Sequence, residues 1–128
     1  MAKLCGEIRA TVTNKVGRLA EVTDKVKDAG VNILALCAWV EGDMGHLLMV
    51  TADNDKVYKA ITPAVETCEF GQVVCVKAAN TPGTLNEIAH KLAGAGVGID
   101  LVYAAAGDAG EATIVLRTTD NDKAAKII

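Results

Sequence analysis

Near its start, the chain alternates apolar and polar side chains. Ile8, Ala10 and Val12 fall on one side of residues 7–13, and their neighbours are polar. An alternation with a period of two predicts a strand that buries one face. A second strand that opens a unit in the same way is expected at residues 72–78.

Each of these strands is followed by a segment with helical spacing. Four apolar residues, three or four positions apart, form one stripe in each segment: Leu19, Val22, Val26 and Ala29 in the first, and Leu85, Ile88, Leu92 and Ala95 in the second. Such stripes predict amphipathic helices. Both segments end in Ala-Gly, at Gly30 and Gly96, where glycine permits the left-handed conformation that stops a helix.

Apolar runs at residues 31–40 and 97–106 come next, and they are typical of strands covered on both faces. The segments GDMG at 42–45 and GDAG at 107–110 predict hairpin turns into strands at 46–51 and 112–118, because Gly and Asp tolerate a positive φ. Asp53 or Asp55 is expected to cap a further helix, and Asp120 or Asp122 its counterpart.

The elements occur twice because the sequence repeats itself. Nearly half of the positions in residues 14–33 are identical in residues 80–99. A period this long indicates two copies of a whole small domain. We expect the first domain at residues 1–70 and the second at 71–128. The second copy stops within its last helix and lacks the final strand, which leaves an edge that another chain could cover.

Composition narrows the classes of function. The chain has 128 residues, a net charge of −3, a pI near 5.3, and only one Trp, two Tyr and one Phe. A negative chain with few aromatic residues is a poor match for nucleic acid or an anionic membrane. No apolar run is long enough to span a bilayer, and no signal core opens the chain, so we expect a soluble cytoplasmic protein.

Candidate chemistry outside the strand-to-helix turns is sparse. None of the four cysteines, Cys5, Cys37, Cys68 and Cys75, sits in a C-x-x-C pair. Three of them lie inside apolar strand-like runs, where a buried reduced thiol is expected. His46 and His90 occupy unrelated positions in the two copies, which disfavours a metal pair. The DND segments at 53–55 and 120–122 could offer carboxylates to a cation, although Asp before a helix is ordinarily a cap. No nucleophile with a base is recognisable, so we expect no catalytic residue, no metal and no cofactor.

The turn Asn80-Thr81-Pro82-Gly83 has the composition of a binding site. Pro82 suits the first helical position, where its missing N–H would be unpaired anyway. Gly83 lets the backbone approach a ligand closely, and the N–H groups of the first helical turn attract a carboxylate. Asn80 can both donate to and accept from an amino acid. Alternatively, Asn80 and Thr81 simply cap the helix.

A strand, an N-x-P-G-x-L turn, a helix ending in A-G-V-N-I and a hairpin at G-D-x-G together resemble the ACT domain family of small ligand-binding regulatory modules. The resemblance covers nearly the whole chain as two tandem copies. It implies an α+β fold of two ferredoxin-like βαββαβ units, whose antiparallel sheets pair edge to edge with helices on one face. We expect that pairing between residues 31–40 and 97–106, since both runs are too apolar to stand as open edges.

The resemblance also implies a ligand site. ACT domains bind amino acids between the Asn-containing turn of one domain and the start of the second strand in its neighbour. The matching residues of this chain are Asn14 and Gly17 in the first turn, Asn80, Thr81, Pro82 and Gly83 in the second turn, and Asn32, Gly98 and Asp100 at the strand starts. The turn at 80–83 facing Asn32 makes a complete site. The turn at 14–17, which has Val16 in place of proline, faces Gly98 and lacks one polar partner.

The leading interpretation is therefore a non-catalytic amino-acid sensor that forms a homodimer or a larger assembly. A close alternative is the detached regulatory subunit of an amino-acid biosynthetic enzyme. An enzyme or an RNA-binding module on the same scaffold is a further alternative. The lack of an acid–base pair counts against the enzyme, and the negative charge and missing strand aromatics count against the RNA-binding module. Fold alone does not separate these classes.

Overall fold

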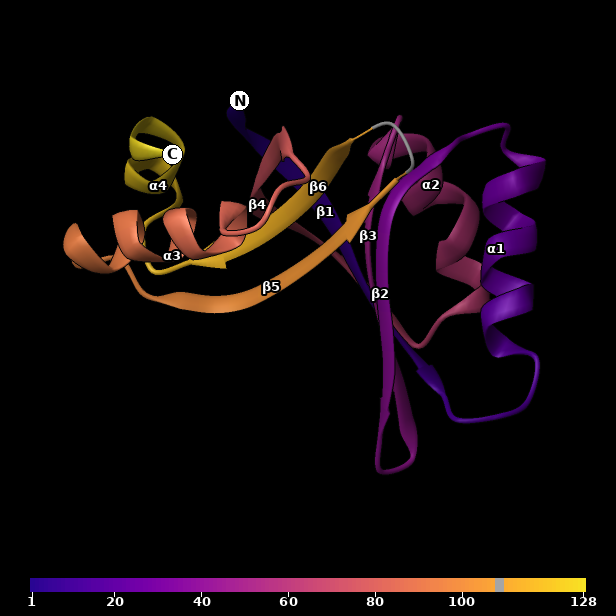
Figure 1. Cartoon of the computed structure of the whole chain (residues 1–128). Coiled ribbons are helices and arrows are strands. Elements are labelled where there is room, and N and C mark those ends of the chain that lie inside the picture. The colour runs from indigo at the N-terminus through magenta and orange to yellow at the C-terminus, as the bar shows by residue number, and fades with distance from the viewer. Residues whose placement is uncertain (108–109) are drawn as a thin grey trace. The chain divides into compact units, whose positions relative to one another are not determined.

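The computed structural model describes residues 1–107 and 110–128, which form two compact units. Gly6–Gly71 make the first unit, and Met1–Cys5 together with Gln72–Ile128 make the second. Figure 1 follows the chain through both units by colour. Asp108 and Ala109, two residues of the expected GDAG turn, lie outside the described residues.

The first unit has the element order predicted from the sequence. Its elements are β1 (Ala2–Thr13, from Gly6 on), α1 (Arg18–Asp28), β2 (Ile33–Glu41), β3 (Met44–Thr51), α2 (Asn54–Ile61), a short 3-10 helix (Thr62–Ala64) and the start of β4 (Thr67–Ala79). β3 lies between β2 and β1, and both pairings are antiparallel. The start of β4 lies beside β1 in the sheet. Just before β4 begins, the Glu66 N–H donates to the Thr11 carbonyl at 2.8 Å. The order is that of a ferredoxin-like βαββαβ unit.

The second unit repeats this plan. It contains the rest of β4, then α3 (Thr84–Gly94), β5 (Ile99–Ala106), β6 (Glu111–Thr118) and α4 (Asn121–Ile127). β6 lies between β4 and β5, again with antiparallel pairing on both sides. The predicted fold class, two tandem ferredoxin-like units, is confirmed.

The fourth strand of the second unit comes from the start of the chain. The Met1 ammonium donates to the Lys77 carbonyl at 2.7 Å, and the Lys77 N–H donates to the Met1 carbonyl at 3.0 Å. Met1–Cys5 thus pair with β4 and act as a fourth strand of the second unit. The sequence assigned these residues to the first unit. The difference arises because β1, at 12 residues, is long enough for its two ends to serve different units.

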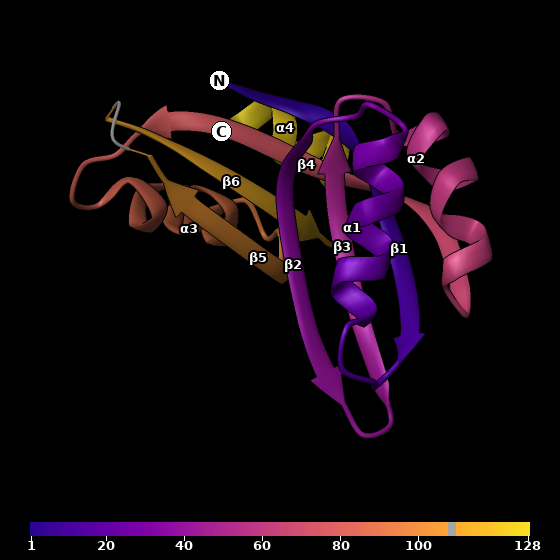
Figure 2. The ribbon, with the colours of Figure 1, turned by 90° about the vertical axis from the view of Figure 1, so that its right-hand side faces the viewer.

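Each unit has its own core, in which paired strands face two helices. In the first unit Ile8 pairs with Met49 and Ala10 with Leu47, and these side chains pack with residues of both helices: Val22, Val26, Val57 and Ile61. Figure 2 shows α1 and α2 alongside the strands they cover. In the second unit Val74 pairs with Leu116 and Val76 with Ile114, against Ile88, Leu92 and Ala124. The two middle residues of each predicted helical stripe lie in these cores: Val22 and Val26 in the first unit, Ile88 and Leu92 in the second.

The predicted pairing of residues 31–40 with 97–106 is wrong within this chain. Among the described residues, β2 is hydrogen-bonded to β3 alone and β5 to β6 alone, so each is an outer strand. The apolar run of β2 has a different cause. Ile33 and Leu36 pack against the core, whereas Leu34 and Val40 on the same strand remain exposed. An unbroken apolar run therefore does not show that a strand is hydrogen-bonded to a neighbouring strand along both of its edges.

The two DND segments act as helix caps. The Asp53 carboxylate accepts the Lys56 N–H at 3.1 Å, and the Asp120 carboxylate accepts the Lys123 N–H at 3.0 Å. In residues 1–107 and 110–128, no group of three or more His, Cys, Asp or Glu side chains could hold a metal ion. The helices of this part of the chain are also too short or too polar to cross a membrane.

Candidate functional site

The two strand-to-helix turns have nearly the same geometry. Gly17 has φ 92° and ψ −3°, and Gly83 has φ 92° and ψ −4°. The Arg18 N–H reaches the Lys15 carbonyl at 3.3 Å, and the Thr84 N–H reaches the Thr81 carbonyl at 3.3 Å. These bonds close four-residue turns at 15–18 and 81–84, in which the glycine is the third residue. A positive φ at the third residue, with ψ near zero, defines a type II turn and requires glycine there.

The glycine is also the N-cap of the helix that follows, so the predicted place of Pro82 is wrong. The helix begins at Thr84, and Pro82 lies two residues before it. Proline suits the second position of a type II turn because its fixed φ matches that position. Within the described residues, neither α1 nor α3 has a side-chain hydrogen bond at its N-cap, so Asn80 and Thr81 do not cap α3.

The first turn of each helix presents unpaired backbone donors. The first helical hydrogen bonds run from Glu21 N–H to the Gly17 carbonyl at 3.0 Å and from Glu87 N–H to the Gly83 carbonyl at 2.9 Å. The preceding N–H groups find no acceptor in the described parts of the chain; they belong to Leu19, Ala20, Leu85 and Asn86. Such donors, at the positive end of the helix dipole, favour an anionic group.

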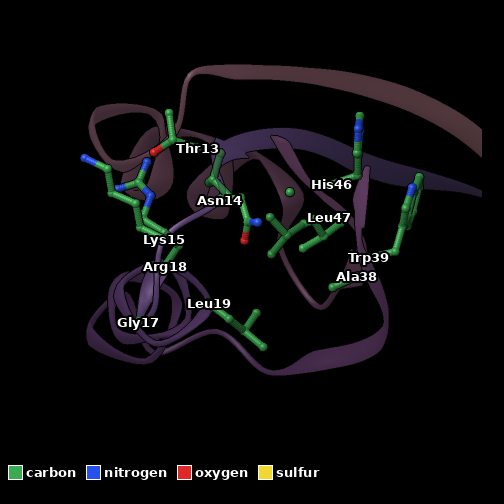
Figure 3. A pocket seen from close by; sticks show the side chains of 13 residues that line it. Thr13, Asn14, Lys15, Gly17, Arg18, Leu19, Ala38, Trp39, His46 and Leu47 are labelled. Atoms are coloured by element: carbon green, nitrogen blue, oxygen red, sulfur yellow. The ribbon is translucent and has the colours of Figure 1, made fainter. Parts of the chain in front are cut away.

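An asparagine stands before each turn with its backbone fixed and its side chain available. The Asn14 N–H donates to the Asp43 carbonyl at 2.9 Å, and the Asn80 N–H donates to the Gly110 carbonyl at 2.8 Å. These bonds tie the turns to their neighbouring hairpins. Figure 3 shows the Asn14 side chain extending toward the space between the turn and the strands.

That space is a hollow, and each unit has one at the same place. The hollow of the first unit, about 260 Å³ in volume, lies between the turn at 14–17, the end of β2 and the start of β3 (Figure 3). Its lining includes Asn14, Gly17 and Arg18 of the turn and Val12, Leu19, Ala38, Trp39, Val40, Gly45, His46 and Leu47 around it.

The hollow of the second unit has a volume of about 320 Å³. Its lining includes Asn80, Thr81, Gly83 and Thr84 of the turn and Leu85, Asn86, Ala104, Ala105, Ala106, Ala112 and Ile114 around it. Because Ala38 pairs with Leu47 and Ala104 with Ile114, the two hollows use equivalent positions of equivalent strands.

Sequence reasoning found the turns but missed the strand residues of both hollows. The ends of β2 and β5 reach the turns only through the sheet register, which no local motif reveals. One signal was available in the helical stripes. Their first members, Leu19 and Leu85, are 48% and 44% exposed, and they line the hollows instead of the cores.

The two turns differ in charge. Lys15 and Arg18 in the first unit correspond to Thr81 and Thr84 in the second. Arg18 forms ion pairs with Glu21 at 2.8 Å and with Glu66 at 3.0 Å. The Nε atom of Arg18 is buried and has no hydrogen-bond partner within the described residues.

In place of these cations, the second turn has threonine hydroxyl groups that form hydrogen bonds within the turn. The Thr84 hydroxyl donates to the carbonyls of Ala79 at 2.8 Å and of Thr81 at 3.1 Å. The same hydroxyl lies 3.1 Å from that of Thr81. The second turn therefore carries no charge of its own.

The three predicted residues of the strand starts do not meet the turn of their own unit. Asn32 and Asp100 are exposed, and they lie at the opposite end of β2 and β5 from the residues that line the hollows. Gly98 exchanges hydrogen bonds with Thr119, 2.9 Å in each direction. A side chain at residue 98 would crowd Thr119, since an added Cβ would lie 3.1 Å from its methyl group.

Aromatic and titratable side chains complete the surroundings of the first hollow. The rings of Trp39 and His46 stack with their centroids 5.0 Å apart and their planes 12° apart. The His46 Nε2 lies 3.9 Å from a Glu41 carboxylate oxygen. His90, by contrast, is exposed on α3 of the second unit.

All four cysteines are thiols, and none lines either hollow. Burial raises the pKa of the Cys68 thiol; a hydrogen bond with Thr62 opposes this shift, and the negative charge of Glu69 adds to it. The thiol is held in its protonated form, which does not suit a nucleophile.

Several solved structures have the same fold as this chain. Protein BT0572 from Bacteroides thetaiotaomicron superposes with a TM-score of 0.90 and 31% sequence identity, covering 98% of this chain and 87% of that one. The ligand-free regulatory subunit of aspartate kinase from Thermus thermophilus gives a TM-score of 0.72 at 12% identity, covering 99% and 94% of the two chains. A structure of aspartokinase alpha and beta subunits gives 0.65 at 13% identity, covering 98% and 93%.

A search of curated proteins found no similar sequence. The family model that describes an ACT domain pair, in contrast, matches residues 6–128, which include both turns and all four helices. This chain belongs to the ACT domain family as an ACT domain pair.

Proposed function

We propose that this chain is a non-catalytic regulatory protein that binds a free amino acid at its strand-to-helix turns. The observation that carries the proposal is the coincidence, in each unit, of three features at one place. A hollow, a pair of unpaired helical N–H groups and an available asparagine side chain meet there. Together they match the carboxylate, the ammonium and the side chain of one amino acid.

In the second unit the ligand carboxylate accepts hydrogen bonds from the N–H groups of Leu85 and Asn86. The Asn80 side-chain oxygen accepts from the ligand ammonium, and the ligand side chain enters the hollow toward Ala104 and Ile114. Gly83 admits this approach because, among the described residues, no atom lies within 4 Å of where its Cβ would be. The first unit offers the equivalent groups at Leu19, Ala20 and Asn14.

We further propose that Asn32 completes the turn at residues 80–83 and that it comes from a second copy of the chain. Asn32 lies at the start of an outer strand, far along it from the hollow of its own unit. When two outer strands pair in antiparallel fashion, the start of one meets the end of the other. The proposal therefore requires a homodimer or larger assembly. The turn at 14–17 receives Gly98 instead, with Asp100 nearby, and is the weaker site.

Regulation of a biosynthetic enzyme is the role that the structural relatives support, since they include regulatory subunits of aspartate kinase. In that role the protein works in the cytoplasm, where amino acids are made, and passes the ligand signal to a partner enzyme or through its own assembly state. A regulatory small subunit held in a permanent complex is the second candidate, and the same relatives favour it.

The test is a thermal-shift screen of the twenty amino acids. A ligand that binds only the folded state raises the melting temperature, by an amount that grows with its concentration relative to Kd. We expect at least one L-amino acid at millimolar concentration to raise it, while its D-enantiomer, the matched control, does not. If none of the twenty shifts the melting temperature and none binds in calorimetry, the proposed function is refuted.

A further inference from the structure

We infer that the two hollows bind an amino acid with an apolar side chain in preference to one with a cationic side chain such as lysine. The inference rests on the proposed function and names the ligand class of the same site. It follows from the charges and the apolar surfaces that line the hollows.

No acidic side chain lines either hollow within the described residues. The ionisable side chains at the first hollow are Lys15, Arg18 and His46, all of them basic. Two acidic residues nearby, Glu21 and Glu66, are already paired with Arg18, and a Glu41 carboxylate oxygen lies 3.9 Å from His46 Nε2. The side-chain ammonium of a lysine ligand, unlike the α-ammonium held by the asparagine, would lose water inside this hollow without gaining a carboxylate, which is unfavourable.

The hollows offer apolar surfaces where a cationic side chain would need a carboxylate. Val12 and Leu47 form a buried floor in the first hollow, while Leu19 and Val40 border it with 48% and 57% of their surface exposed. An aliphatic or aromatic ligand side chain would remove these exposed surfaces from water. The volume of about 260 Å³ lies just below the usual range for small-molecule pockets, about 300–1,000 Å³, and so suits a single amino acid.

The second hollow is also apolar, but unlike the first it has no charged side chain among the described residues of its lining, so the two hollows can be compared within one protein. Thr81 and Thr84 replace the two cations, and Ala105 and Ala106 replace Trp39 and Val40. Discrimination against a cationic ligand is therefore expected at both hollows and is stronger at the first. Lys15 and Thr81, which occupy equivalent positions, allow the charge to be changed at one hollow at a time.

The test is calorimetry with leucine, phenylalanine and lysine on the full chain and on charge variants. We expect the unmutated chain to bind leucine or phenylalanine about tenfold or more tightly than lysine. Lys15→Glu and Thr81→Glu should each move the ratio of leucine to lysine affinity toward lysine. Lys59→Glu is the matched control: it makes the same charge change as Lys15→Glu on the exposed face of α2, and it should leave the ratio unchanged.

Two results would overturn the inference while leaving the proposed function standing. One is lysine binding as tightly as leucine and phenylalanine. The other is an affinity ratio that Lys15→Glu and Thr81→Glu shift no more than Lys59→Glu does. Binding of no amino acid at all would overturn the proposed function and, with it, the inference.

Discussion

Met1 and Lys77 exchange two main-chain hydrogen bonds, of 2.7 Å and 3.0 Å, across an antiparallel pair of strand segments. Through this contact the beginning of the chain becomes the fourth strand of the second unit. The boundary between the two sequence repeats therefore differs from the boundary between the compact units. Changes near Met1 should affect the unit that contains α3 and α4.

We predict that Lys3→Pro destabilises the second unit. Proline removes a backbone N–H from β1 and fixes φ, so the segment pairs less well with β4. The expected loss is about 1 kcal/mol or more of unfolding free energy, measured by urea denaturation. Lys3→Ala is the control and should have little effect, because this side chain is exposed. Equal stability of the two variants would mean that residues 1–5 are not an integral strand.

Gly17→Ala and Gly83→Ala should each cost stability through backbone strain alone. Both glycines have φ 92°, where a side chain costs about 1–2 kcal/mol, and no atom of the described residues lies within 4 Å of either added Cβ. Gly94→Ala, at the end of α3, is the control. Gly94 does not have a positive φ, and its added Cβ would meet no described atom within 4 Å, so this change should be neutral or stabilising. Thermal melts that rank Gly94→Ala as the most damaging variant would contradict the turn geometry.

Gly71→Ala should destabilise the first unit by displacing Arg9. An added Cβ would overlap the Arg9 guanidinium, which forms an ion pair with the fully buried Glu7 at 2.8 Å. We expect a loss of about 1–3 kcal/mol. In an Arg9→Ala background the effect of Gly71→Ala should shrink, because nothing remains to be displaced. A double-mutant cycle by chemical denaturation measures this coupling, and additive effects would count against it.

Cys68 should react slowly with thiol reagents near pH 8. Burial raises the pKa of its thiol above the usual 9.0, so a smaller fraction is thiolate at this pH than in an unperturbed cysteine. Peptide mass spectrometry after brief alkylation measures the rate at each cysteine. We expect the rate at Cys68 to increase as the pH rises beyond 9, and the expectation fails if Cys68 is the first of the four to be modified.

Much of the fold was predictable because its determinants are local. The alternation at Ile8, Ala10 and Val12 and the helical stripe through Val22 and Val26 both identify core residues. The place of residues 1–5 was not predictable in this way. Their role depends on which unit β1 continues into, and residues 2–6 carry no alternation that indicates a partner.

The candidate site was predictable in part, for the same reason. Asn80 and Gly83 stand out locally as a turn that offers donors and space. The hollow beside them depends on strand pairings such as Ala104 with Ile114, which bring residues distant in sequence to the turn. Pro82 was misplaced by two positions because proline suits both the first helical residue and the second position of a type II turn.

The central claim, an amino acid held by the turn at 80–83 and Asn32, is tested most directly by calorimetry on three matched variants. Asn80→Ala and Asn32→Ala should each weaken the tight site roughly tenfold to more than a hundredfold, because each removes a hydrogen bond to a charged ligand group. Asn14→Ala, the equivalent change in the other turn, should leave the tight site nearly intact. If Asn14→Ala proves the most damaging of the three, or if none of them changes the affinity, the site assignment is contradicted.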